Sequence, residues 1–149
     1  MRKPWVPLAQ NAYRGQPVMT SYCPSCWCEA GSASVCPACG AEIQSLSQES
    51  YEEKLIRALH HPEPTVPVRT ATILGELGSR AAVEPLIEVA LSSGDPYIQE
   101  AAVVALGRIG DSKALPCLTR LSREGSLRVR IAADQTIKLL EGLPNAGEG

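Results

Sequence analysis

From residue 51 onward, apolar residues recur at steps of three and four, the spacing that puts them on one side of an α-helix. In the clearest stretch the apolar positions are Ile98, Ala101, Ala102, Ala105, Leu106 and Ile109. Asp95 before this stretch is a suitable N-cap, Pro96 suits the first helical position, and Gly110 suits a left-handed end. The pattern predicts one helix here and a second directly after it, with apolar positions Leu115, Leu118 and Leu121.

The same pattern occurs more than once. Residues 63–66 (EPTV) match residues 95–98 (DPYI) at an offset of 32, and at that offset LGELG at 74–78 falls on LGRIG at 106–110. A third copy begins at residue 126, where AA at 132–133 matches AA at 101–102 at an offset of 31. Residues 51–59 read as a second helix without its first, and residues 129–140 as a first helix without its second. We therefore expect six helices: half a unit, two whole units and half a unit.

The second copy, DPYIQEAAVVALGRIGD at residues 95–111, resembles the HEAT repeats, in particular the short HEAT-like type associated with phycobilisome lyases. The resemblance extends over about residues 50–142. It departs at Pro67-Val68, and at Lys138, where the third copy lacks the glycine. The resemblance implies an all-α fold, a short α-solenoid of helix pairs with an extended surface for partners. It also implies, as an alternative function, a bilin lyase or chromophore chaperone.

The composition agrees with helices that pack closely. Only 4% of the residues are aromatic and Phe is absent, so Ala, Leu, Ile and Val must form the core. Small residues such as Ala105 and Gly107 let neighbouring helix backbones approach each other. The formal net charge is −2 with no strongly basic half, so nucleic-acid binding is an alternative that we do not favour. Because no apolar run has signal or membrane-spanning length, we expect a cytoplasmic protein without membrane contact.

Five of the six cysteines fall between residues 23 and 39, a clustering that indicates metal binding rather than disulfides. Two CPxC knuckles, at residues 23–26 and 36–39, offer four thiolates for the tetrahedral coordination that zinc prefers. We predict a structural Zn²⁺ bound by Cys23, Cys26, Cys36 and Cys39, in a unit that resembles a zinc ribbon. Iron in a rubredoxin-like site is the other metal that fits. Cys28 is either a bystander or a ligand that exchanges with Cys26.

The chain therefore divides into five segments. Residues 1–20 are expected to be an extended arm, whose Trp5 and Tyr13 could dock on a partner or on the rest of the chain. Residues 21–42 form the zinc ribbon, 43–49 a linker, 50–142 the helical repeats and 143–149 a flexible tail.

The other reactive residues favour structural roles. His60 and His61 fall at the end of a helix before Pro62, where a histidine interacts favourably with the helix dipole. The sequence contains no His-Glu dipeptide, the pair that HEAT-type di-iron hydroxylases use. Cys117 is expected to be a small buried side chain, and the lyase resemblance implies a bilin-handling thiol as the alternative. Because the spacing reveals no catalytic set, we expect that the chain is not an enzyme.

These features favour a non-catalytic protein–protein interaction module, that is, an adaptor, scaffold or assembly factor. The face made by successive second helices, together with the basic residues that follow, is the expected partner surface. Its charged residues are Glu84, Glu88, Arg120, Arg123, Arg128 and Arg130.

The last predicted helix has no second helix after it. Its apolar positions are Val129, Ala132, Ala133, Ile137 and Leu140. We expect these positions to be uncovered, so that the helix either binds a second copy of the chain, with the ribbon packed on the other end of the array, or docks a partner.

Overall fold

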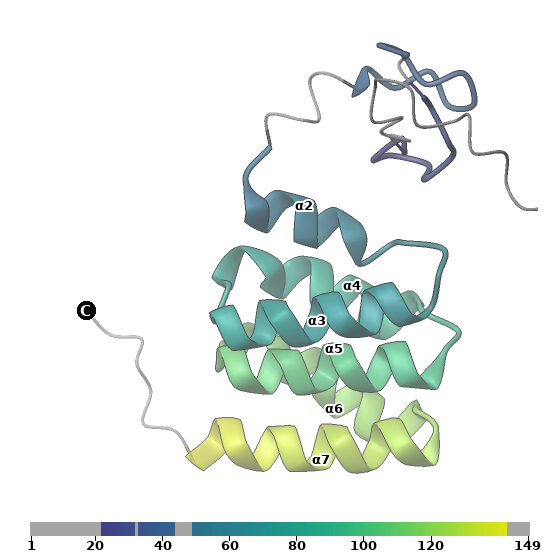
Figure 1. Cartoon of the computed structure of the whole chain (residues 1–149). Helices are drawn as coiled ribbons and strands as arrows, with labels where there is room; N and C mark the ends of the chain where they lie inside the picture. Colours follow the sequence, from purple (N-terminus) through teal and green to yellow (C-terminus); the bar gives the residue numbers. More distant parts are fainter. Residues whose placement is uncertain (1–21, 32, 44–48, 143–149) are drawn as a thin grey trace, which may run out of the picture. The chain divides into compact units, whose positions relative to one another are not determined.

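The computed structural model describes residues 22–31, 33–43 and 49–142 (Figure 1). The chain divides into two compact units, Met1–Leu46 and Ser47–Gly149, and each is described by itself. The expected arm at residues 1–20, most of the linker and the tail at 143–149 lie outside the described residues.

The second unit contains the six expected helices. They are α2 (Tyr51–Ala58), α3 (Thr65–Leu77), α4 (Val83–Ser92), α5 (Pro96–Ile109), α6 (Leu115–Glu124) and α7 (Leu127–Gly142). The short 3-10 helices η1 (Arg80–Ala82) and η2 (Ser112–Ala114) precede α4 and α6. In Figure 1, α3, α5 and α7 lie side by side in one layer, while α4 and α6 form a second layer behind it. This arrangement of two helical layers confirms the expected all-α solenoid.

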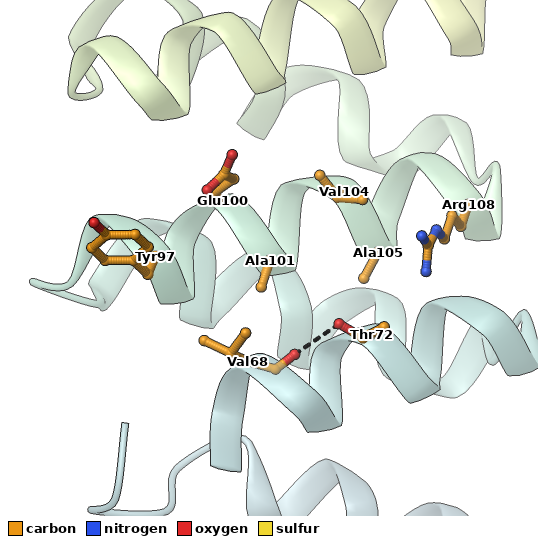
Figure 2. Close-up of a pocket in the computed structure, with 8 residues that line it drawn as sticks. All are labelled: Val68, Thr72, Tyr97, Glu100, Ala101, Val104, Ala105 and Arg108. Carbon is orange, nitrogen blue, oxygen red and sulfur yellow. Dashed lines mark hydrogen bonds between the residues drawn. The ribbon is translucent and has the colours of Figure 1, made fainter. Parts of the chain in front are cut away.

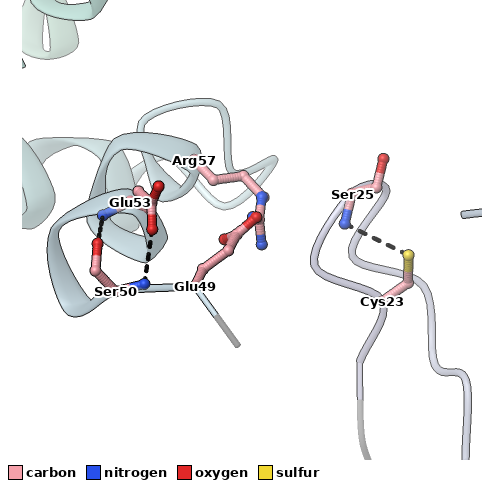
Figure 3. A network of polar contacts seen from close by, with 6 residues as sticks. All are labelled: Cys23, Ser25, Glu49, Ser50, Glu53 and Arg57. Carbon is pink, nitrogen blue, oxygen red and sulfur yellow. Dashed lines mark hydrogen bonds and ion pairs between the residues drawn. The ribbon is translucent and has the colours of Figure 1, made fainter. Parts of the chain in front are cut away.

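The helix boundaries follow the capping residues. Ser50 begins α2 with a capping box, in which its hydroxyl accepts the Glu53 N–H at 3.2 Å and the Glu53 carboxylate accepts the Ser50 N–H at 2.7 Å (Figure 3). The Asp95 carboxylate accepts the Tyr97 N–H at 2.8 Å and so begins α5, as the sequence predicted. Gly110 ends α5 with φ 75°, in the left-handed region that favours glycine.

The core repeats with the sequence. Leucines that are 32 residues apart occupy equivalent buried places, Leu74 with Leu106 and Leu86 with Leu118. Among the described residues, no aromatic side chain is buried, in agreement with the composition. The interior is therefore filled by short aliphatic side chains, which allow the helices to lie close together.

Two glycines set the spacing of the layer formed by α3, α5 and α7. A Cβ atom on Gly75 would lie 2.9 Å from Cα of Ala105, and one on Gly107 would lie 2.8 Å from Cγ2 of Thr136. These distances are too short for real contacts, so neither position has room for a side chain in the present packing. At Gly75 the neighbour is the backbone of α5, whereas at Gly107 it is the side chain of Thr136 in α7. A close approach of two helix backbones is therefore seen at Gly75, and the one expected at Gly107 is a contact between backbone and side chain.

The expectation that the apolar stripe of α7 is uncovered is wrong. Val129, Ala132, Ala133 and Leu140 are buried and Ile137 is partly buried, because α7 packs against both α5 and α6. The large apolar residues of α7 that remain exposed are Leu127, Ile131 and Leu139.

The outer side of α7 differs from that of α5 at two decisive positions. Exposed Asp134 and Lys138 take the places that buried Val103 and close-packed Gly107 hold one repeat earlier. A further helix stacked on α7 in the same register would bury a carboxylate and collide with a lysine side chain. Self-association through α7 stays a prediction. It would need a helix register different from the one in which α7 packs on α5.

We expect the substitution Gly75→Ala to destabilise the helical unit. Alanine gains about 1 kcal/mol of helix propensity over glycine. The added methyl group meets the backbone of α5, and overpacking of that kind costs about 1–3 kcal/mol, so the net change is a loss. Urea unfolding followed by circular dichroism measures the difference. Gly94→Ala is the matched control, because its Cβ meets nothing within 4 Å; equal stability of the two variants would contradict the close approach.

Candidate metal centre and interaction groove

The first unit is built from two knuckles of the same geometry. In the first, the Cys23 N–H donates to the Cys28 carbonyl at 2.8 Å and the Trp27 N–H donates to the Cys23 carbonyl at 2.8 Å. A single antiparallel bridge between Tyr22 and Glu29 closes this knuckle.

The second knuckle repeats this pattern 13 residues later. The Cys36 N–H donates to the Ala41 carbonyl at 2.9 Å, and the Gly40 N–H donates to the Cys36 carbonyl at 2.9 Å. Val35 and Glu42 form the closing bridge. The two halves are therefore pseudo-symmetric, although the described residues of this unit form bridges rather than regular strands.

The knuckles bring four thiols together. Sγ of Cys23 lies 3.6 Å from Sγ of Cys39, and Sγ of Cys26 lies 3.5 Å from Sγ of Cys36. All four sulfur atoms lie within 4.8 Å of one another. A tetrahedral ion with metal–sulfur bonds of about 2.3 Å requires sulfurs roughly 3.8 Å apart, so the four thiols fit such an ion. Among the described residues this is the one cluster of that kind, and exposed Cys28 is outside it.

Backbone N–H groups favour the thiolate form of the buried cysteines. The N–H of Cys39 lowers the pKa of Cys36 to about 6, and the N–H of Ala38 acts in the same direction. Hydrogen bonds from the backbone of Cys26 and Ser25 lower the pKa of Cys23, and Figure 3 shows the Ser25 N–H directed at Sγ of Cys23 at 3.4 Å. Because thiolates are the form that binds metal, these N–H groups favour metal binding at Cys23 and Cys36. The pKa of Cys26 is raised instead, because the N–H of Cys28, which lowers it, is outweighed by burial and the neighbouring thiols together.

The residue after each knuckle's second cysteine has a left-handed backbone. Gly40 has φ 73°, which costs glycine nothing, whereas Trp27 has φ 62° at the equivalent place. Such a conformation is strained for a bulky residue. The sequence analysis did not predict the left-handed conformation of Trp27. An alignment of CPSCW with CPACG would have indicated it, because Trp27 falls on Gly40.

A groove opens on the helical unit between α3 and α5. Figure 2 shows Val68 and Thr72 of α3 facing Ala101 and Ala105 of α5. Together with Tyr97 and Val104 these residues line a hollow of about 200 Å³. A second hollow shares Val68 and Tyr97 with the first. Its other lining residues are Pro64, Thr65, Arg69 and Asp95. The two hollows therefore form one groove, and Tyr97 and Val104 expose 61% and 40% of their surface on its α5 side.

The repeat explains why the groove lies between α3 and α5. At three equivalent positions α3 has Thr65, Val68 and Thr72; α5 has Tyr97, Glu100 and Val104; and α7 has Arg128, Ile131 and Gln135. The short side chains of α3 leave space beside Tyr97. On the other side of α5, the long side chain of Arg128 in α7 reaches across to Glu100 and Tyr97. The side chains at these equivalent positions therefore differ in length between the helices, and this difference leaves a hollow on one side of α5.

Ion pairs link the three helices of this face. Arg108 of α5 lies 3.5 Å from Glu76 of α3, and Arg128 of α7 lies 2.7 Å from Glu100 of α5. The Arg128 guanidinium also lies 4.7 Å from the centroid of the Tyr97 ring, a cation–π contact. Tyr97 is thereby held in place while much of its ring stays open to the groove.

The residues predicted to bind a partner do not share one face. Glu84 and Glu88 are exposed on α4, and Arg120 and Arg123 are exposed on α6, where Arg120 pairs with Glu124 at 2.8 Å. Arg130 is exposed on α7. Arg128, in contrast, is directed at α5 and belongs to the groove face. The sequence analysis did not identify the groove residues Val68, Tyr97 and Val104. The sequence does indicate them, because each is an apolar or aromatic residue outside the buried stripe of its helix.

The other reactive residues have structural surroundings. Cys117 is buried in α6, as predicted, and burial raises the pKa of its thiol. His60 follows the end of α2, and Nδ1 of His61 accepts the Glu63 N–H at 3.0 Å. No helix within the described ranges is long and apolar enough to cross a membrane.

Comparison with known proteins identifies the family. The sequence profile of the HEAT repeats matches residues 52–138, more than half of the chain, so the chain belongs to the HEAT-repeat family. The chain is also similar to phycocyanobilin lyase subunit alpha of Picosynechococcus sp., with 44% identity over 66 residues. This match covers 43% of the chain and only 24% of the relative.

That relative corrects one expectation from the sequence. We expected that the chain is not an enzyme because its residues form no recognisable catalytic set. The similar protein is named as a lyase subunit, and lyases are enzymes. The expectation is therefore wrong, and an absent catalytic motif does not exclude an enzymatic role for a HEAT-repeat chain.

Proposed function

We propose that this chain is a protein-binding adaptor, scaffold or assembly factor whose helical array binds a partner through the groove between α3 and α5. The observation that carries this proposal is the apolar hollow beside Tyr97. Tyrosine is common among the residues that dominate binding energy at interfaces, especially where it is rigid. Arg128 and Glu100 support that rigidity, because they fix the ring before a partner arrives.

We propose that the metal in the first unit is Zn²⁺ with a structural role. Among the described residues the cluster consists of four cysteines, which fill the four positions of a tetrahedral zinc ion, as is typical of structural zinc sites. The buried apolar residues described in this unit are only Cys23, Ala30 and Cys36. Because a core of this size is too small to stabilise the folded unit, metal binding must supply most of its folding free energy. The cytoplasm, where thiols stay reduced, is the compartment that suits such a site.

The outer face of α4 and α6 remains a second proposed partner surface. Glu84 and Glu88 on α4 and Arg123 on α6 are exposed charged residues for which no ion pair is found among the described residues. Such a face would bind a charged partner, and salt would weaken that binding. A nucleic-acid partner has less support, because the net charge of −2 opposes it.

A second candidate function is a part in bilin attachment, as in the lyase subunit that the chain resembles. The 44% identity over 66 residues favours this candidate. The match spans about a quarter of that relative, and the role proposed here is that of a bilin lyase or a chromophore chaperone.

We expect Val104→Asp to abolish partner binding by the groove while leaving the fold intact. A buried carboxylate in an apolar interface costs several kcal/mol, and Val104 is already partly exposed in the free chain. Tagged wild-type and variant chains are used to capture partners from an extract of the source organism, with mass spectrometry and circular dichroism as readouts. The paired variant Arg120→Glu with Arg123→Glu is the control. If that variant loses the partner and Val104→Asp keeps it, the partner binds α4 and α6 instead.

We expect one equivalent of zinc in the chain when it is purified without chelator, and loss of the metal in Cys36→Ser. Gly40→Ala should weaken zinc binding about fivefold, since a left-handed conformation costs alanine about 1 kcal/mol more than glycine and no neighbour lies within 4 Å of the added Cβ. Competition with a chromophoric chelator measures the affinity. Ala38→Gly is the control in the same knuckle. Less than half an equivalent of zinc, or iron in its place, would contradict the assignment.

For the second candidate, the full chain is mixed with phycocyanobilin and an apo-phycobiliprotein. Faster attachment of the chromophore, followed by absorbance, is the expected result if the chain handles bilin. Tyr97→Ala tests whether the groove takes part, and Cys117→Ala tests the buried thiol. Attachment that proceeds at the same rate with and without the chain would remove this candidate.

A further inference from the structure

We propose that the groove between α3 and α5 binds an amphipathic helix of a partner protein, and that Arg69 binds an acidic residue of that helix. This inference rests on the proposed function, because it names the chemistry of the partner for the same groove. Three features of the groove carry it: its apolar floor, its length and the distribution of charge around its rim.

The floor of the groove favours a helix over an extended segment. It consists largely of side-chain carbon atoms from Val68, Ala101 and Val104, with the ring of Tyr97 as a wall. An extended segment would bring unpaired backbone N–H and carbonyl groups against this apolar floor. A helix has already paired those groups internally, and it can present apolar side chains alone.

The length of the groove suits about three helical turns. Tyr97 and Arg108, which line its two ends, are 11 residues apart on α5. At about 1.5 Å per residue this separation is roughly 16 Å. A partner helix with apolar residues at the first, fourth, fifth and eighth positions of a repeat would place one face along that distance.

The rim of the groove leaves one cation without a partner. The carboxylates of Glu76 and Glu100 pair with Arg108 and Arg128, and the Asp95 carboxylate accepts the Tyr97 N–H at 2.8 Å as the cap of α5. Arg69 lines the second hollow, and within the described ranges no carboxylate lies in ion-pair distance of it. The groove therefore complements an apolar helix that carries a carboxylate near the end beside Arg69.

The test uses two synthetic fluorescein-labelled helical peptides and the full chain. Both peptides have leucines at the apolar positions, and they differ only at their ends, where one has Glu and the other Lys. Placing the charge at both ends makes the result independent of peptide orientation. Fluorescence anisotropy measures the dissociation constants, and circular dichroism confirms that each chain variant is folded.

We expect the Glu peptide to bind the wild-type chain about threefold to fivefold more tightly than the Lys peptide, the range of an exposed ion pair. Arg69→Glu should reverse this preference, and Arg80→Glu, a change at an exposed arginine of η1, should leave it unchanged. Val104→Asp should weaken binding of both peptides, because it removes the apolar contact that they share.

The outcomes separate this inference from the proposed function. If both peptides bind through Val104 with equal affinity, or if Arg69→Glu changes nothing, the charge recognition is overturned while the groove remains a binding site. Tighter binding of the Lys peptide would assign recognition to Asp95 and overturn the role of Arg69. If neither peptide binds, the inference fails. The proposed function fails only if Val104→Asp also leaves capture of the natural partner unchanged.

Discussion

The close approach of the helix backbones in one layer is the constraint on which the helical unit depends. Gly75 lies against Ala105, and Gly107 against Thr136, at distances that admit no further side chain. Helices this close leave room only for short aliphatic residues between them, which accounts for a core without buried aromatic side chains among the described residues. The same spacing brings Arg108 to Glu76 and Arg128 to Glu100, so the ion pairs of the outer face follow from the packing of the core.

The two units solve the problem of a small core in different ways. The helical unit stacks similar pairs, so each helix covers the apolar stripe of the one before, and α7 is covered by α5 and α6. The described residues of the first unit bury only three apolar side chains, and its knuckles instead converge on four thiols. Left-handed glycines occur at turns in both units. In the first unit, backbone N–H groups are also directed at a cysteine sulfur.

Membership of the HEAT-repeat family fixes the architecture, and the side chains that differ between repeats determine what the surface can bind. Short residues at Thr65, Val68 and Thr72 open the groove beside Tyr97, and Arg128 holds that ring from the other side. The similarity to part of a phycocyanobilin lyase subunit indicates that sequence related to this array also occurs in a protein named as an enzyme subunit. Departures from the repeat therefore carry more information about function than the repeat itself.

The repeat and the cysteine spacing were enough to predict the six helices, the caps at Asp95 and Gly110, and the four cysteines that come together. Each of these depends on neighbours within a few residues or on a repeat that can be read by alignment. The packing of the helices was needed to show that Val129 and Leu140 are buried, that Arg128 contacts Tyr97, and that a groove lies between α3 and α5. These features depend on which residues face each other across helices, and that register is set by the closest backbone contacts, which a single sequence does not display.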